Sequence, residues 1–161
     1  MTPLWFITLC GAAVIATGLV AGVFLAFSDF VMKALRATST APAIEAMQVI
    51  NRKVYGSAFL VFLLGLAPVT LFIAMYAFAT LSGPAAIWVI SGGLLYVVGV
   101  IAVTMVCNVP MNKRLDALDH SSDEAAAYWQ IYLSQWTAWN HVRTVASAAS
   151  AVCLFVGVMT V

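Results

Sequence analysis

The residues best suited to chemistry lie in one nine-residue stretch, WTAWNHVRT, at positions 136 to 144. It contains two indoles, an amide, an imidazole and a guanidinium, in a chain that is 64% hydrophobic. On a helix, Trp136, Asn140 and Arg143 share a face, and His141 projects about 100° away from Asn140. An imidazole can act as a base near neutral pH, and a guanidinium or amide can hold an oxyanion. The stretch is therefore a candidate catalytic segment.

Three other segments place polar residues next to long apolar stretches. They are Ser28-Asp29, Asn51-Arg52-Lys53 and the run from Asn108 to Asn112. Polar groups at the edge of an apolar stretch are costly when they face lipid, so we expect all four segments to gather in one inward-facing layer. In this layer Asp29 is the expected counter-ion of Arg143. The amides are expected to orient a bound polar molecule.

The composition determines the kind of protein in which this layer must form. A mean hydropathy of +1.04 with 8% charged residues lies outside the range of water-soluble domains. The lipid bilayer is therefore the first predicted partner, and residues 1–161 are expected to form a single transmembrane domain. A net charge of +1 provides no field for nucleic acid, so nucleic-acid binding is excluded.

Four apolar segments are long enough to span a bilayer, namely residues 4–27, 57–81, 85–107 and 142–161. All charged residues fall in or beside the connections 28–56 and 108–141, which emerge on the same side of a four-helix chain. By the positive-inside rule, this side is cytoplasmic and both termini lie outside, in the inner (cytoplasmic) membrane. The predicted fold is an all-α, integral membrane, four-helix antiparallel bundle with short interfacial helices in the two cytoplasmic connections.

The connections carry helix signals of their own. Thr40-Ala41-Pro42 is typical of the start of a short helix, and Ser121 to Glu124 of the start of another. The second is expected to run on into the fourth span, with Trp129 and Tyr132 at headgroup depth. Small residues predict close helix contacts at Gly18 and Gly22 and in the run from Ala146 to Ala151.

No motif indicates a cofactor, and the cofactor is therefore unknown from sequence. Cys10, Cys107 and Cys153 lie in apolar runs without zinc-site spacing, so we expect them to be buried thiols. With only two histidines, a multi-histidine metal centre is not predicted. Ligation of a haem by His141 alone stays open as an alternative.

Four segments of the chain resemble a known family. They are AGVFLAFSDFVMKAL (21–35), AMQVIN (46–51), NVPMNKRL (108–115) and WTAWNHVRT (136–144). Together they are similar to the signature segments of small four-helix membrane proteins, long classed as a domain of unknown function, that include the anthrone oxygenases. The family pattern falls here on Asn51, Asn108, Pro110, Asn112, Trp136, Trp139, Asn140, His141, Arg143 and Thr144.

The resemblance implies oxidation of a planar aromatic, anthrone- or hydroquinone-like molecule by O₂, without flavin or haem motifs. An anthrone methylene is acidic because its conjugate base is an aromatic phenolate, and such anions react with O₂. His141 is the expected base, and Arg143 with Asn140 or Asn108 is expected to hold the oxyanion.

Trp136 or Trp139 is expected to stack on the substrate, with Asn51 and Asn112 as further contacts. The alternative is a non-enzymatic membrane subunit for binding or assembly, in which the polar layer is structural. The sequence leaves open whether the chain forms a homo-oligomer.

Overall fold

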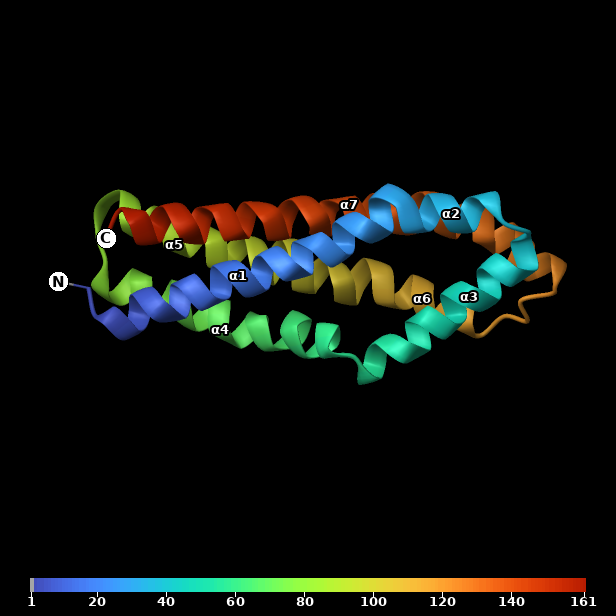
Figure 1. Ribbon diagram of the computed structural model, residues 1–161, viewed down its shortest axis with the longest axis horizontal. Helices are drawn as coiled ribbons and strands as arrows, with labels where there is room; N and C mark the ends of the chain where they lie inside the picture. Colours follow the sequence, from blue (N-terminus) through green and yellow to red (C-terminus); the bar gives the residue numbers. More distant parts are fainter. Residues whose placement is uncertain (1) are drawn as a thin grey trace.

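The computed structural model describes residues 2–161, which are helical apart from short connections (Figure 1). The elements are α1 (Leu4–Ala26), η1 (Phe27–Val31), α2 (Met32–Ala37), α3 (Thr40–Lys53), η2 (Val54–Gly56), α4 (Ala58–Thr80), α5 (Gly83–Leu94), η3 (Leu95–Ala102), η4 (Thr104–Asn108), α6 (Val109–Asp116) and α7 (Asp123–Met159). The η1, η3 and η4 segments are π-helical, and η2 is a 3-10 helix.

These elements join into four long rods, residues 4–37, 58–80, 83–116 and 123–159, each apolar and long enough to cross a membrane. Successive rods run in opposite directions, so both termini and the α4–α5 turn lie at one end, the terminal end (Figure 1). The opposite end, the charged end, holds α2, α3, α6 and the start of α7. The predicted all-α four-helix membrane bundle is confirmed.

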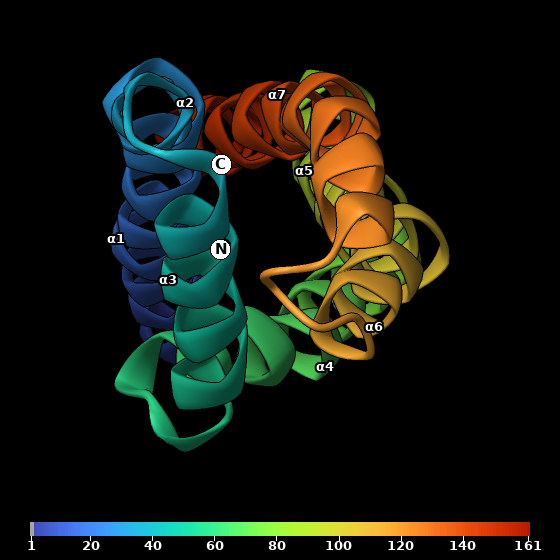
Figure 2. The ribbon, with the colours of Figure 1, turned by 90° about the vertical axis from the view of Figure 1, so that its right-hand side faces the viewer.

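Viewed end-on, the rods form a ring in the order α1, α7, α5, α4, and each rod contacts its two neighbours (Figure 2). Large apolar side chains such as Ile15, Phe78 and Val145 point outward and are exposed. In water such a surface would be unfavourable, whereas in a bilayer it meets acyl chains. The outward faces are those expected of an integral membrane protein.

The first and third rods extend beyond the predicted ends of their spans. The sequence predicts ends near residues 27 and 107, but the backbone passes through η1 into α2 and through η4 into α6 without a break. Polar side chains there do not stop a helix whose neighbours satisfy them. The fourth rod is continuous from Asp123, as predicted, and Ser122 caps it by accepting a hydrogen bond from the Ala125 N–H at 3.1 Å.

Close helix contacts form at glycines other than those predicted. Gly18 and Gly22 are exposed, and a methyl group added to either would meet nothing within 4 Å, so their assignment to a contact within the bundle was wrong. A methyl group on Gly93 would instead lie 2.6 Å from the Thr70 carbonyl oxygen, and one on Gly99 would lie 2.5 Å from the Ala146 methyl. The third rod therefore packs backbone-close against α4 and α7.

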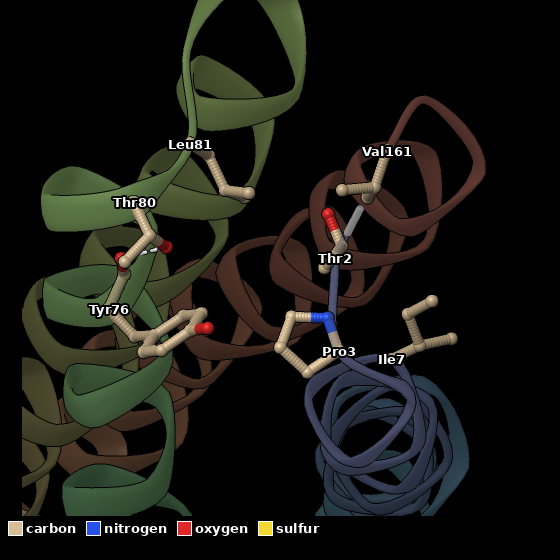
Figure 3. A pocket seen from close by; sticks show the side chains of 7 residues that line it. All are labelled: Thr2, Pro3, Ile7, Tyr76, Thr80, Leu81 and Val161. Carbon is tan, nitrogen blue, oxygen red and sulfur yellow. Dashed lines mark hydrogen bonds between the residues drawn. The ribbon is translucent and has the colours of Figure 1, made fainter.

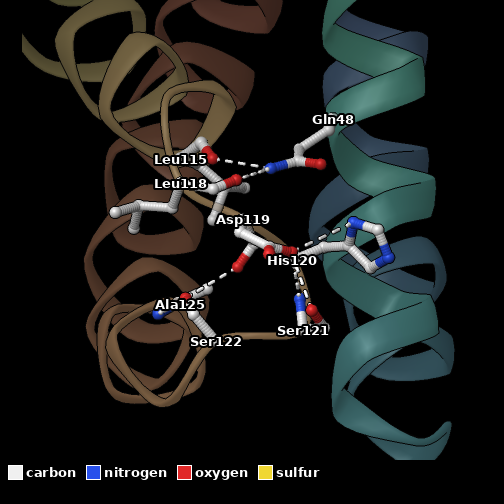
Figure 4. Close-up of polar contacts among 8 residues, drawn as sticks. All are labelled: Gln48, Leu115, Leu118, Asp119, His120, Ser121, Ser122 and Ala125. Atoms are coloured by element: carbon white, nitrogen blue, oxygen red, sulfur yellow. Dashed lines mark hydrogen bonds and ion pairs between the residues drawn. The ribbon is translucent and has the colours of Figure 1, made fainter.

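At the charged end, α3 runs obliquely along one side of the bundle, from α2 toward the start of α4, and is held to the end of α6 (Figures 2 and 4). Gln48 Nε2 donates to the carbonyls of Leu115 and Leu118, at 2.8 and 2.9 Å. In the following loop, the backbone N–H and hydroxyl of Ser121 donate to Asp119 and hold its pKa below the usual range. These contacts fix α3 as a wall of the charged end.

The glycine contacts yield a test of the packing. Gly93→Ala should lower the free energy of unfolding by about 1–3 kcal/mol, because the new methyl group meets a backbone carbonyl that cannot move aside. Unfolding of the detergent-solubilised protein by sodium dodecyl sulfate, followed by circular dichroism, measures the loss. Gly18→Ala is the matched control and should not lower the free energy of unfolding, because its methyl group meets nothing and alanine favours a helix. Equal losses in the two variants would contradict the assignment of the contacts.

Candidate functional site

The inward face of α7 provides most of the polar groups of the candidate site. Because α7 is one unbroken helix, residues three or four apart keep facing the same way along its length. Its inward stripe consists of Trp129, Tyr132, Trp136, Asn140, Arg143, Ser147, Ser150, Leu154 and Gly157. Aromatic rings occupy the part nearest the charged end, small residues the part nearest the terminal end. The amide and the guanidinium lie between them.

Asn140 is completely buried and fixed by three hydrogen bonds. Its Nδ2 donates to the Phe24 carbonyl at 2.7 Å and to the Ser28 hydroxyl at 2.6 Å. Its Oδ1 accepts from Arg143 Nη2 at 2.6 Å. The amide thus ties the first rod to the fourth and sets the position of the guanidinium.

Arg143 is buried, with 5% of its surface exposed. Besides its bond to Asn140, its Nη1 donates to the Thr104 hydroxyl at 3.3 Å, and its Nε has no hydrogen-bond partner. The guanidinium carbon lies 4.3 Å from the centre of the Phe24 ring and 5.3 Å from that of Trp136. Aromatic faces stabilise a cation, but they do not neutralise its charge.

No acidic side chain within residues 2–161 pairs with Arg143, since the ion pairs there are Lys33–Asp29, Arg52–Asp116 and His120–Asp119. The predicted Asp29–Arg143 pair was therefore wrong. Ser28 points inward to Asn140, so the next residue along the helix, Asp29, points outward, where it lies 3.3 Å from Lys33. The buried cation has no anion of its own.

The rings on α7 form a stack that ends at the guanidinium. Trp129 and Tyr132 lie 5.5 Å apart with planes 15° from parallel, and Tyr132 and Trp136 lie 5.6 Å apart at 17°. Trp129 and Tyr132 are both buried against α3 and α6, so neither ring is exposed to lipid, and their depth relative to the headgroups stays a prediction. Asn112 fastens the stack, since its Oδ1 accepts from the Tyr132 hydroxyl and the Trp136 indole, both at 2.7 Å.

A cavity of about 410 Å³ opens beside this network, between the first rod, α3, α4, the third rod and α7. Its apolar wall includes Phe24, Phe27, Ile50, Phe59, Leu60 and Leu63, and its ionisable lining residues are Arg143, Lys53 and Tyr55. Lys53 and Tyr55 are exposed and mark the mouth, whereas Arg143 lies at the base. An apolar cavity with a cation at its base and no lining carboxylate favours an anionic ligand.

Five of the eight residues singled out from the sequence line this cavity, namely Asn51, Asn112, Trp136, Asn140 and Arg143. Asn108 is buried nearby and donates to the Trp136 carbonyl at 3.2 Å without lining the cavity, and its Oδ1 has no partner. The remaining two residues, Trp139 and His141, do not line the cavity. Trp139 is 41% exposed and His141 is also exposed, because each lies about 100° around the helix from the inward Asn140. His141 therefore does not face the cavity, a point that the sequence left open, and of the two tryptophans expected to stack on a substrate only Trp136 lines it.

Several residues of the site escaped the sequence analysis. Phe24, Thr104 and Tyr132 were not assigned to it, although all three contact the residues that were. The π-helical segments η1 and η4 supply Phe27, Ser28, Thr104 and Asn108 to this layer. π-Helical turns occur frequently at functional sites, but they cannot be predicted from the residue types along a span.

A second hollow, of about 730 Å³, lies at the terminal end (Figure 3). It is lined by Thr2, Pro3, Ile7, Tyr76, Thr80, Leu81 and Val161. Their side chains are neutral, and they offer hydroxyls but no cation, imidazole or amide. The cavity at Arg143 is therefore the stronger candidate site.

Comparison with known proteins adds one finding. A family model described as anthrone oxygenase matches residues 58–153, more than half of the 161-residue chain. The matched segment carries Asn112, Trp136, Asn140 and Arg143, whereas the walls from α1 and α3 lie outside it. No curated protein and no solved structure matches the chain.

The polar network yields a second prediction. Asn140→Ala should lower the free energy of unfolding by about 3 kcal/mol, because it leaves a buried guanidinium N–H without its acceptor and removes the amide's bonds to the Phe24 carbonyl and the Ser28 hydroxyl. The detergent-unfolding assay measures this loss. Asp29→Asn is the control and should cost less than about 0.5 kcal/mol, because it removes only an exposed pair. A larger loss for Asp29→Asn than for Asn140→Ala would be inconsistent with this network.

Proposed function

The chain belongs to the anthrone oxygenase family, and from that premise we propose that it is a membrane-embedded oxygenase. It uses O₂ to oxidise a planar aromatic molecule of the anthrone or hydroquinone type. The observation that carries this proposal is the buried Arg143, which has no acidic partner and faces an aromatic-lined cavity.

The cavity suits such a substrate in size and lining. Its volume of about 410 Å³ lies within the range of small-molecule sites, roughly 300–1,000 Å³. Phe24, Phe27 and Phe59 offer apolar surface to a flat ring system. A substrate oxygen that carries negative charge would find the guanidinium at the base of the cavity, where low polarity strengthens their attraction.

The proposed reaction on an anthrone turns a methylene into a ketone. The methylene first loses a proton, and the resulting anion places its charge on the ring oxygen, next to Arg143. The anionic carbon then gives two electrons to O₂ and, with one proton, becomes a hydroperoxide. Loss of water breaks the O–O bond and leaves the ketone, so that one oxygen atom enters the product and the other leaves as water.

In this proposal, Arg143 promotes the loss of the proton by stabilising the anion. We do not retain His141 as the base, because its side chain is exposed and does not line the cavity. The proton leaves to solvent through the mouth at Lys53 and Tyr55.

We also propose that the charged end faces the cytoplasm. Lysines and arginines lie in or beside the connections at this end, as the positive-inside rule requires of a cytoplasmic side. The helix α7 is about 55 Å long at 1.5 Å per residue, longer than the roughly 30 Å of hydrocarbon it crosses. The site near its middle would then lie toward the inner leaflet, where a lipophilic aromatic substrate concentrates.

Oxygen uptake with anthrone as substrate tests the proposal. Arg143→Met should lower kcat/KM by about 100- to 1,000-fold, the usual effect of losing one oxyanion-stabilising donor. The unfolding temperature of the same variant checks that it is folded, since methionine removes a buried charge but leaves the buried Asn140 Oδ1 without its donor. Arg143→Lys keeps the charge and should retain intermediate activity.

His141→Ala is the control for the base and should keep kcat/KM within about 2-fold of the unmodified protein, as for an exposed side chain away from the reaction. Unchanged oxygen uptake by a folded Arg143→Met protein would refute the proposed role of the guanidinium. A loss of uptake in His141→Ala as large as in Arg143→Met would restore the imidazole as the base.

A further inference from the structure

Asn112 lines the cavity, and the orientation of its side-chain amide is fixed by its neighbours. The Tyr132 hydroxyl and the Trp136 indole N–H approach the same side-chain atom of Asn112, each at 2.7 Å. An indole N–H donates and never accepts, so this atom is the carbonyl oxygen. The NH₂ group of Asn112 is therefore the end that points elsewhere.

The amide of Asn51 supports the same orientation of the Asn112 side chain. Asn51 Nδ2 lies 3.5 Å from the Tyr132 oxygen and donates to it, which leaves the hydroxyl proton for Asn112 Oδ1. The donors thus run in one sense, from Asn51 through Tyr132 to Asn112. An inverted Asn112 amide would place its N–H groups against two other donors.

Asn112 is half-buried and lines the cavity, and its NH₂ group has no acceptor among residues 2–161, so this donor is open to water or to a ligand. It differs in this from Asn140, whose amide uses both of its ends within the protein. Asn112 and Arg143 also lie on different parts of Trp136. Asn112 contacts the indole N–H, and the guanidinium carbon lies 5.3 Å from the ring centre.

We infer that Asn112 Nδ2 binds a second, uncharged acceptor oxygen of the ligand whose anionic oxygen Arg143 holds. The ligand class is then a fused aromatic molecule with two oxygen substituents, one anionic and one neutral. Asn112 acts as a specificity-determining residue, because its donor selects among rings that Arg143 alone would bind alike. This inference rests on the proposed function, since it takes the Arg143 anion site as given.

Binding of unreactive probes tests the inference without turnover. The probes are 2-naphthoates that carry either a methoxy or an ethyl group at position 6 or 7. The carboxylate supplies the anion for Arg143, and the methoxy oxygen can accept but not donate. The ethyl group has a similar size and accepts nothing. Titration calorimetry on the full chain in detergent micelles gives each dissociation constant.

The unmodified protein should bind at least one methoxy probe about 5- to 10-fold more tightly than its ethyl counterpart, as one added hydrogen bond allows. Asn112→Asp retains a carboxylate oxygen for Tyr132 and Trp136 but has no N–H, so this ratio should fall to about 1-fold. Its new charge weakens the binding of both carboxylate probes, and its oxygen also repels the methoxy oxygen, so the ratio can only fall further.

Absence of a methoxy preference in the unmodified protein, or its persistence in Asn112→Asp, overturns the inference. Arg143→Met separates this failure from failure of the proposed function. Loss of binding of all four probes in Arg143→Met supports the anion site, whatever Asn112 does. Unchanged binding in that variant overturns the anion site itself.

Discussion

A positive charge held inside an apolar bundle without an acidic partner is the constraint on which the rest of the structure depends. Burying an ion is costly unless other groups replace its water, and here an amide, a hydroxyl and two aromatic faces do so for Arg143. None of these groups cancels the charge. The guanidinium therefore keeps a field that a bound anion would meet at the cavity.

The two ends of the bundle are packed differently, and this difference positions the buried cation. Toward the terminal end, glycines bring the third rod to backbone contact with α4 and α7, which leaves little freedom for the helices to shift. Toward the charged end, large rings and the oblique helix α3 pack against the rods and border the cavity. The tight half fixes the rotation of α7, and that rotation decides which of its side chains face the cavity. The site is therefore positioned by packing well away from it.

Hydrophobicity and charge were sufficient to predict the four spans, the helix at Thr40 and the unbroken α7, because a bilayer demands long apolar helices with satisfied backbones. They also predicted a polar layer that includes Asn51, Asn112 and Asn140. They could not predict helix rotation, because each residue step turns a side chain by about 100°. His141 and Asp29 each lie one step from an inward residue, and both face outward. The π-helical turns were equally invisible, since they depend on which neighbour accepts each backbone hydrogen bond.

A cavity that offers a fixed cation and no lining carboxylate or imidazole sets a condition on its chemistry. It can stabilise an anion that forms readily, but it has no strong base with which to create one. The proposed substrates meet this condition, because aromatisation makes their conjugate bases accessible near neutral pH. The proposed reaction also needs a supply of the aromatic substrate and of O₂. The membrane can provide both, since lipophilic rings and O₂ dissolve in hydrocarbon. In the proposed reaction, the substrate would supply the reducing electrons, the bilayer would deliver both reactants, and the protein would supply one preorganised charge.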